Sequence, residues 1–452
     1  MQEKNKGDFM LPVEEAPLLS HNNYSNGQPR TNCTRGVSGA HENTRKRALA
    51  RRGFVAILVA WLYWSVFGHP GFRGGFFGGH HDDRCRKDLV PWDGPSKIEA
   101  TTSNLEVKFG KGNLVTSVQV LTGDVSEPTV IIRANVSASH HHDPDSDHGD
   151  YDDKVVVAAK TLKTYKDYGL HLEVQDDDGK VRVYFWAEEN FGHRHRERFC
   201  GNIDVDVVLP KDLKEFGRLA VLGTLLKVTT HDISAIAFEK VKFSSVVGSI
   251  VVDSLVTDSL VSDVTTGPIV VKALTAPSGT PLKATLSTTV GQADLVAIVP
   301  DLSDDYEGDG HTVDIHSTTG DIHLDVSPAD NSKKSSHTTP GDISVTTSTD
   351  VGLAVNNIDL ADGQLLFLRS KSATGTVDST VSDKFLGQFS LRTDMGTVAV
   401  IGAEDSASEI EYQKNSPRVK IGRKFIKTDD GKVQEGQIAV LSDFGRAKLT
   451  FV

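Results

Sequence analysis

A short polar turn that ends in glycine is the feature that most constrains this chain. It is clearest in residues 313–326, where two alternating strands flank the sequence Ser317-Thr318-Thr319-Gly320. Glycine permits a positive φ at low steric cost, so two strands can meet at a sharp bend without a long loop. Recurrence at intervals of roughly 20 to 30 residues is typical of the repeat arrays called solenoids. The glycines that end such turns are Gly248, Gly267, Gly291, Gly320, Gly341, Gly375 and Gly396.

The strands that flank the turn alternate apolar and polar residues. This alternation predicts that Val313, Ile315, Ile322 and Leu324 point inward. One coil cannot bury such a stripe alone, but coils stacked about 4.8 Å apart bury it continuously and pair their backbones. We therefore predict an all-β fold built as a parallel β-helix, or solenoid. An antiparallel β-sandwich is the alternative, because period-two strands with glycine turns serve it equally well.

Composition divides the chain into segments. Residues 1–52 are polar and lack apolar periodicity, so they are predicted to be a disordered cytosolic tail, and residues 70–100 are predicted to be a Gly/His-rich stalk. From 101 to 403 almost every apolar segment alternates with period two, and this range is assigned to the β-solenoid domain. Residues 404–452 are predicted to form terminal strands that cap the open end of the array.

An uncharged apolar run at 54–67 lies within a predicted transmembrane helix, residues 53–69. At ~1.5 Å per residue the run is shorter than the roughly 30 Å hydrocarbon core, and flanking arginines and aromatic residues would make up the difference. Basic residues crowd its N-terminal side, which predicts a single-pass signal anchor with a cytosolic N-terminus. The C-terminal domain would then be extracellular or in the secretory-pathway lumen, and Asn135, in the sequon Asn135-Val136-Ser137, would be open to glycosylation. A cleaved signal peptide is the alternative.

Charge and cysteine content narrow the range of partners. The net charge is −12, and a surface of this sign repels phosphate backbones, so nucleic acid is not expected as a partner. The 3 cysteines show neither a CxxC pair nor zinc-finger spacing. Cys85 and Cys200 would form a disulfide if both face an oxidising compartment, and otherwise they are two unrelated thiols.

A row of acidic and histidine side chains is the sharpest catalytic candidate. Parallel β-helix lyases and hydrolases place paired carboxylates on an outward face, which raises the alternative of a membrane-tethered carbohydrate-active enzyme. However, the solvent-facing positions of an alternating strand must be polar, and acidic residues suit a chain of this charge. We therefore assign no catalytic residue and treat the row as a surface cluster. Its members are Asp314, His316, Asp321, His323 and Asp325.

A second cluster, residues 140–150, combines imidazoles with carboxylates, which are groups that bind metals. Its spacing fails that of an EF-hand, because Gly149 is one place late and Lys154 stands where a glutamate would close the site. No metal site and no cofactor are predicted.

Three turns within short β runs resemble the putative adhesin family of bacterial and fungal surface proteins. They are Thr318-Thr319-Gly320-Asp321-Ile322, Thr338-Thr339-Pro340-Gly341-Asp342-Ile343 and Asp394-Met395-Gly396-Thr397-Val398. The likeness covers residues 201–402, and the anchor ahead of the domain resembles the fungal members. This resemblance implies an exposed, non-enzymatic β-solenoid and supplies no catalytic residues. We therefore expect adhesion or surface scaffolding, with cell-wall polysaccharide or a surface glycoprotein as the partner.

Overall fold

The computed structural model describes residues 89–110, 114–137, 154–157, 162–167, 170–177, 179–187, 201–303, 305–306, 308–329, 338–339, 342–402, 408–426 and 435–452. They belong to one compact unit, Asp82–Val452. Every regular element within these ranges is a β-strand, so the all-β prediction is confirmed. No helix in the described residues is long and apolar enough to cross a membrane. The segments 1–52, 53–69 and 140–150, together with Cys85 and Cys200, lie outside the described residues.

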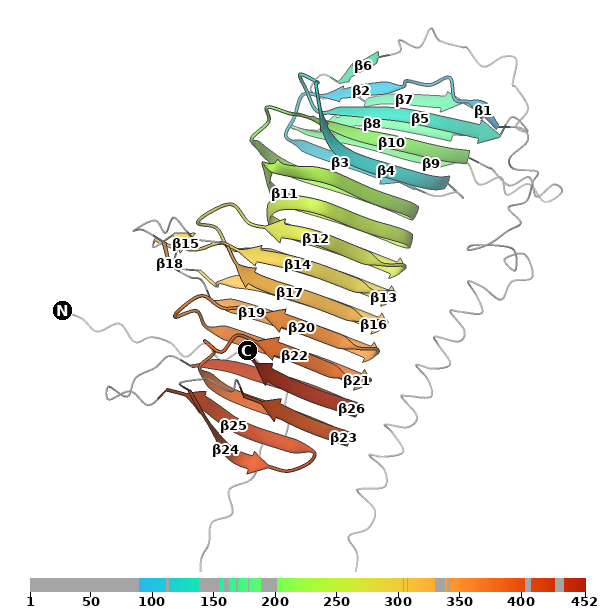
Figure 1. Cartoon of the computed structure of the whole chain (residues 1–452). Coiled ribbons are helices and arrows are strands. Elements are labelled where there is room, and N and C mark those ends of the chain that lie inside the picture. The colour runs from blue at the N-terminus through green and yellow to red at the C-terminus, as the bar shows by residue number, and fades with distance from the viewer. Residues whose placement is uncertain are drawn as a thin grey trace, which may run out of the picture. The chain divides into compact units, whose positions relative to one another are not determined.

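The centre of the fold is a stack of bent coils (Figure 1). In each coil one strand runs to a glycine corner and the next runs back from it, as β16 (His311–Thr319) and β17 (Ile322–Pro328) do around Gly320. Strands that precede a corner pair in parallel with their counterparts in neighbouring coils, and together they form the before-corner sheet. Strands that follow a corner pair in the same way and form the after-corner sheet.

Both sheets are ladders of short parallel strands, and their arrows point in opposite directions in Figure 1. The before-corner sheet contains, in stacking order, the end of β11 (Glu215–Thr266), β13 (Lys283–Val290), β16, β19 (Ile343–Val351), β21 (Leu366–Thr374) and the first halves of β26 (Gly436–Phe451) and β23 (Gly387–Ile401). The after-corner sheet contains an inner part of β11, β12 (Ile269–Thr275), β14 (Ala293–Val299), β17, β20 (Ala354–Ile358), β22 (Val377–Val381) and the second halves of β26 and β23. Parallel pairing of coil on coil is the pattern expected of a solenoid.

Alternation along the strands decides which side chains are buried. Val313, Ile315, Ile322 and Leu324 are at most 2% exposed, as predicted. They belong to a single apolar cluster of buried residues that extends from the first strands to the last. Removal of this continuous stripe from water is the main stabilising contribution, since full burial of one such side chain is worth roughly 1.5–3 kcal/mol.

The corner position requires glycine. Gly320 has a φ of 145°, and a Cβ atom placed there would lie 2.0 Å from the carbonyl oxygen of Gly291 in the preceding coil. The same close approach is repeated along a column of corner glycines, which in stacking order are Gly248, Gly267, Gly291, Gly320, Gly352, Gly375, Gly445 and Gly396. The sequence pattern does not select Gly352 and Gly445, and Gly341 lies outside the described residues.

A hydroxyl side chain three residues before the corner links one coil to the previous one. Ser317 Oγ donates to the carbonyl oxygen of Gly291 at 3.2 Å, and Thr349 Oγ1 donates to that of Gly320 at 3.0 Å. Such a hydrogen bond contributes about 1 kcal/mol net, and it also fixes the register of neighbouring coils. The same bond is made by Thr288, Ser372, Thr393 and Ser442.

At the N-terminal end both ladders continue with mixed pairing. One contains β11, β4 (Leu114–Gly123), β10 (Gly201–Pro210), β5 (Thr129–Ser137), β1 (Leu89–Pro91), β2 (Lys97–Ala100) and β6 (Lys154–Val157). The other contains β11, β3 (Asn104–Phe109), β9 (Lys180–Ala187), β8 (Leu170–Asp177) and β7 (Leu162–Asp167). Since β1 and β2 pair with β5, the folded region includes residues ahead of the predicted boundary at 101.

The C-terminal segment has two different locations. β24 (Glu409–Asn415) and β25 (Val419–Phe425) form an antiparallel hairpin that pairs with β23 at the end of the stack. β26 instead lies between the β21–β22 coil and β23, and it pairs in parallel with all three strands. Antiparallel pairing, which a sandwich would use throughout, is found among the described residues at the two ends and in the short pair β15 (Leu302–Ser303) with β18 (Thr338–Thr339).

Candidate functional site

The structure divides the predicted Asp/His cluster between the two sheets. Asp314 and His316 face outward from β16, in the before-corner sheet, whereas Asp321, His323 and Asp325 lie beyond the Gly320 corner on the after-corner side. β16 pairs with β13 and β19, and β17 pairs with β14 and β20, so the two groups are not neighbours within one sheet. The five side chains therefore do not converge on one reacting position.

Several members of the cluster instead hold one coil to the next. Asp321 Oδ1 accepts a hydrogen bond from a backbone amide of the next coil at 2.8 Å, and Asp325 accepts one from Asn357 at 2.7 Å. His316 Nδ1 lies 3.3 Å from the hydroxyl of Ser348. These contacts give the cluster a structural role. Asn135, the predicted glycosylation site, is an exposed residue of β5, and its modification stays a prediction.

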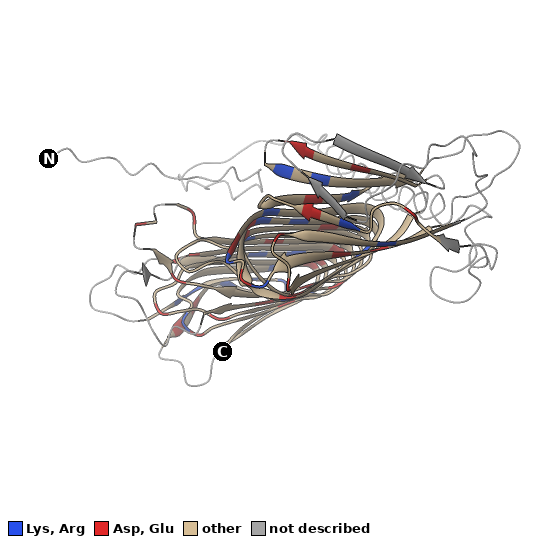
Figure 2. Ribbon diagram, turned by 90° about the horizontal axis from the view of Figure 1, so that it is seen from above, with Lys and Arg blue, Asp and Glu red and all other residues tan. Residues whose placement is uncertain are grey.

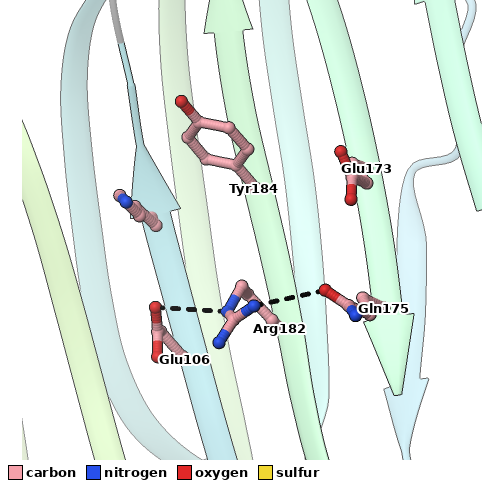
Figure 3. A pocket seen from close by; sticks show the side chains of 6 residues that line it. Glu106, Glu173, Gln175, Arg182 and Tyr184 are labelled. Carbon is pink, nitrogen blue, oxygen red and sulfur yellow. Dashed lines mark hydrogen bonds and ion pairs between the residues drawn. The ribbon is translucent and has the colours of Figure 1, made fainter. Parts of the chain in front are cut away.

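A hollow of about 420 Å³ lies on the outward face of three adjacent strands, β3, β9 and β8 (Figure 3). We call the outward surface of these three strands the β3–β9–β8 face. Alternation turns Leu105, Val107 and Val183 into the core, so the residues between them face the hollow. The lining side chains are Glu106, Lys108, Glu173, Gln175, Arg182 and Tyr184.

Strand register aligns these side chains into two rows. In the first row Arg182 of β9 lies between Glu106 of β3 and Gln175 of β8. In the second row Tyr184 of β9 lies between Lys108 of β3 and Glu173 of β8. The rows form because parallel β3–β9 pairing joins segments that are more than 70 residues apart in the sequence.

The first row is a connected polar network. Arg182 Nε lies 3.4 Å from Glu106 Oε1, and Arg182 Nη1 donates to Gln175 Oε1 at 3.2 Å, as the dashed lines of Figure 3 show. Lys180 also pairs with Glu106. Burial raises the pKa of Glu106, but the hydrogen bond from Lys180 and the charges of Lys180, Arg182 and Lys108 together hold that pKa below its ordinary value. Glu106 is therefore a carboxylate near neutral pH, and it does not have the raised pKa of a general acid.

Aromatic rings adjoin the polar network. The Tyr184 and Trp186 rings are stacked with centroids 5.0 Å apart, and the His171 and Trp186 rings are stacked at 4.8 Å. Lys108 Nζ lies 5.3 Å from the centroid of the Tyr184 ring. Gly110 leaves room for that ring, since a Cβ at this position would lie 2.1 Å from the phenolic oxygen. Figure 3 shows the Tyr184 ring face-on, spread along the sheet beside the first row.

Glu173 differs from the other charged residues of the face. Within the part of the chain that the structure describes, its carboxylate makes no hydrogen bond or ion pair, although it borders Tyr184. An ionised carboxylate only accepts hydrogen bonds, and it can accept several at once. Glu173 is therefore available to a ligand that donates.

The sequence patterns that predicted the Asp/His cluster do not point to this face. The available signal was the alternation of Arg182, Tyr184 and Trp186 along β9, which places three large side chains on one side of a strand. Among the described residues, no group of three or more His, Cys, Asp or Glu side chains is arranged to hold a metal ion. Charged residues of both signs are interspersed along the described strands (Figure 2).

Comparison with known proteins gives similarity to solved structures alone. No family model and no curated protein matches the chain. A "putative adhesin" from Parabacteroides merdae is 10% identical, covers 81% of this chain and 97% of its own, and has a TM-score of 0.32. One from Parabacteroides distasonis is 11% identical, with coverages of 81% and 97% and a TM-score of 0.31. One from Bacteroides fragilis is 9% identical, with coverages of 81% and 98% and a TM-score of 0.27.

Proposed function

We propose that this protein is a non-catalytic adhesion protein that binds saccharide chains on its β3–β9–β8 face. The observation that carries the proposal is the combination of stacked rings, Tyr184 and Trp186, with a polar row that contains Glu106, Arg182 and Gln175. A pyranose ring has one apolar C–H face and a rim of hydroxyl groups. An aromatic surface bordered by fixed donors and acceptors matches both parts.

The carboxylates of the face are poorly suited to glycoside hydrolysis. Glu106 of β3 lies in the first row and Glu173 of β8 in the second, with β9 between the two strands. A glycosidase needs a carboxyl group with a raised pKa as its general acid, close to a second carboxylate. The pKa of Glu106 is instead lowered by its basic neighbours, which argues against an acid–base role. Binding without bond cleavage is the function that these observations favour.

We further infer that residues 53–69 anchor the protein in a membrane as a single-pass helix. The apolar run and the basic residues ahead of it support this inference, and they direct the C-terminal domain to the extracellular side or to the lumen. A bound saccharide would then be a cell-wall polysaccharide or the glycan of a surface glycoprotein.

The test uses the full chain, purified in mild detergent and incubated with insoluble cell-wall polysaccharides. Retention without release of soluble sugar is expected. Tyr184→Ala combined with Trp186→Ala should lower retention at least 10-fold, because both stacking surfaces are removed. Tyr412→Ala on β24 is the matched control, since it removes another partly exposed tyrosine far along the chain. Unchanged retention in the double variant, or sugar release by the purified protein, would refute the proposal.

A further inference from the structure

We propose that the β3–β9–β8 face selects neutral polysaccharides over acidic ones, and that Glu173 accepts hydrogen bonds from adjacent hydroxyl groups of a neutral pyranose unit. This inference rests on the proposed function and adds the chemical class of the ligand. The cations of the face already contact other protein groups, whereas Glu173 is available to a ligand.

The cations of the face are engaged by other protein groups. Arg182 is held between Glu106 and Gln175, and Lys180 also pairs with Glu106. Lys108 lies over the Tyr184 ring. An acidic sugar would have to draw one of these groups away from its present contact, and each such exchange forfeits an interaction that already exists.

The carboxylate of Glu173, in contrast, has no hydrogen bond or ion pair among the described residues. Its two oxygens can accept from two neighbouring hydroxyl groups at once, and hydrogen bonds to a charged acceptor are stronger than neutral ones. Glu173 borders Tyr184 in the second row, so a pyranose that packs against the exposed part of the Tyr184 side chain would bring its rim of hydroxyls to Glu173.

Electrostatic repulsion between Glu173 and an acidic sugar opposes binding of acidic polysaccharides. A uronic acid in the same position would place its carboxylate beside that of Glu173, and like charges that are brought together without water between them oppose binding. The net charge of −12 adds a long-range repulsion against polyanions. Attraction of the hydroxyl donors and repulsion of the acids therefore act in the same direction.

The test compares the full chain and its Glu173→Gln variant on three immobilised probes, which are a neutral glucan, a neutral mannan and polygalacturonate. The unmodified protein should bind one neutral probe at least 10-fold more tightly than polygalacturonate, and added salt should change this binding little, because the ligand is uncharged. Glu173→Gln should weaken the neutral interaction about 10-fold, the effect of losing one charge-assisted hydrogen bond, and should strengthen binding of polygalacturonate. Glu239→Gln, an exposed carboxylate of β11, is the matched control and should change neither.

The outcomes separate the two proposals. Tighter binding of polygalacturonate than of both neutral probes, or a Glu173→Gln variant that binds all probes as the unmodified protein does, would overturn the inference. The proposed function would survive if binding still depended on Tyr184 and Trp186. Absence of binding to every polysaccharide, or retention of a deglycosylated surface protein instead, would overturn both.

Discussion

At the scale of single residues, two glycines with positive φ illustrate what the coil corner demands. Gly320 has a φ of 145° and faces the carbonyl oxygen of Gly291, whereas Gly363 has a φ of 80° and has no heavy atom within 4 Å of the Cβ position. Both positions disfavour a side chain through backbone strain. Only Gly320 adds a direct collision with the backbone of the neighbouring coil.

Substitution of these two glycines by alanine should therefore have unequal effects. Gly320→Ala is expected to lower the free energy of unfolding by about 3 kcal/mol or more, because strain of about 1–3 kcal/mol combines with displacement of the Gly291 coil. Gly363→Ala should cost about 1–2 kcal/mol, the cost of left-handed geometry alone. Urea unfolding followed by circular dichroism measures both. Equal losses would contradict a close-packed corner.

His311 is a fully buried residue at the start of β16. Its Nδ1 accepts a hydrogen bond from the Leu282 amide at 3.1 Å. Burial lowers the pKa of His311 to about 4, although the nearby Pro300 carbonyl and the charge of Asp301 act in the opposite direction. The ring is therefore neutral in the folded protein across the range in which an unfolded histidine, with a pKa of 6.5, takes up a proton.

Stability should consequently fall as the pH falls from about 6.5 to about 4. In this window the unfolded chain binds a proton at His311 and the folded chain does not, which favours unfolding by up to about 3 kcal/mol. His311→Asn keeps an acceptor for the Leu282 amide but does not titrate. Urea unfolding at several pH values should show a shallower pH dependence in the variant than in the unmodified protein. Identical slopes would show that His311 is not the group responsible.

At the scale of elements, one buried lysine adds to the backbone pairing that attaches the β24–β25 hairpin to β23. Lys424 of β25 is 1% exposed, and its Nζ lies 2.8 Å from the Asp383 carboxylate and donates to the Phe385 carbonyl at 3.2 Å. The ammonium also lies 5.2 Å from the centroid of the Phe451 ring. These contacts join β25 to the loop before β23 and to the last residues of β26.

Lys424→Ala should loosen the hairpin without melting the coils. Removal of the buried ammonium leaves the Phe385 carbonyl without its donor and the partly exposed Asp383 carboxylate without its cation, which costs about 1–3 kcal/mol. Hydrogen exchange measured by mass spectrometry should become faster in residues 409–425 and remain slow in β16 and β17. Lys414→Ala, an exposed lysine of β24 in the same hairpin, should leave exchange unchanged. Uniform acceleration along the whole stack would contradict a local attachment.

At the scale of the whole molecule, alternation predicted the strands and their buried faces, but spacing did not predict all corners. From Gly248 to Gly396, successive corner glycines are separated by as few as 19 residues, from Gly248 to Gly267, and by as many as 32, from Gly320 to Gly352, and the next corner, Gly445, comes 49 residues after Gly396. Loops on the far side of each coil absorb these differences, so no fixed period marks a corner. Hydroxyl groups three residues earlier mark it better, because they bond to the previous coil.

The candidate site could not be predicted from the sequence for a different reason. Glu106 and Arg182 meet only because β3 and β9 pair in parallel, and a local pattern does not specify which distant strand will be a neighbour. Alternation correctly placed Asp314 and Asp325 outward, yet it did not reveal that a corner sends them to different sheets. Sequence patterns thus gave the orientation of each side chain, while strand pairing determined which side chains came together.

The position of β26 has a consequence for the order of folding. β26 follows β23, β24 and β25 in the sequence, yet in the stack it lies between the β21–β22 coil and β23. During synthesis β23 therefore emerges before the strand on which it stacks, and until β26 has emerged β23 has no parallel partner on that side. A chain interrupted before residue 436 would keep a gap in the array, with unpaired strand edges on either side. Such edges are sites of aggregation and of recognition by chaperones.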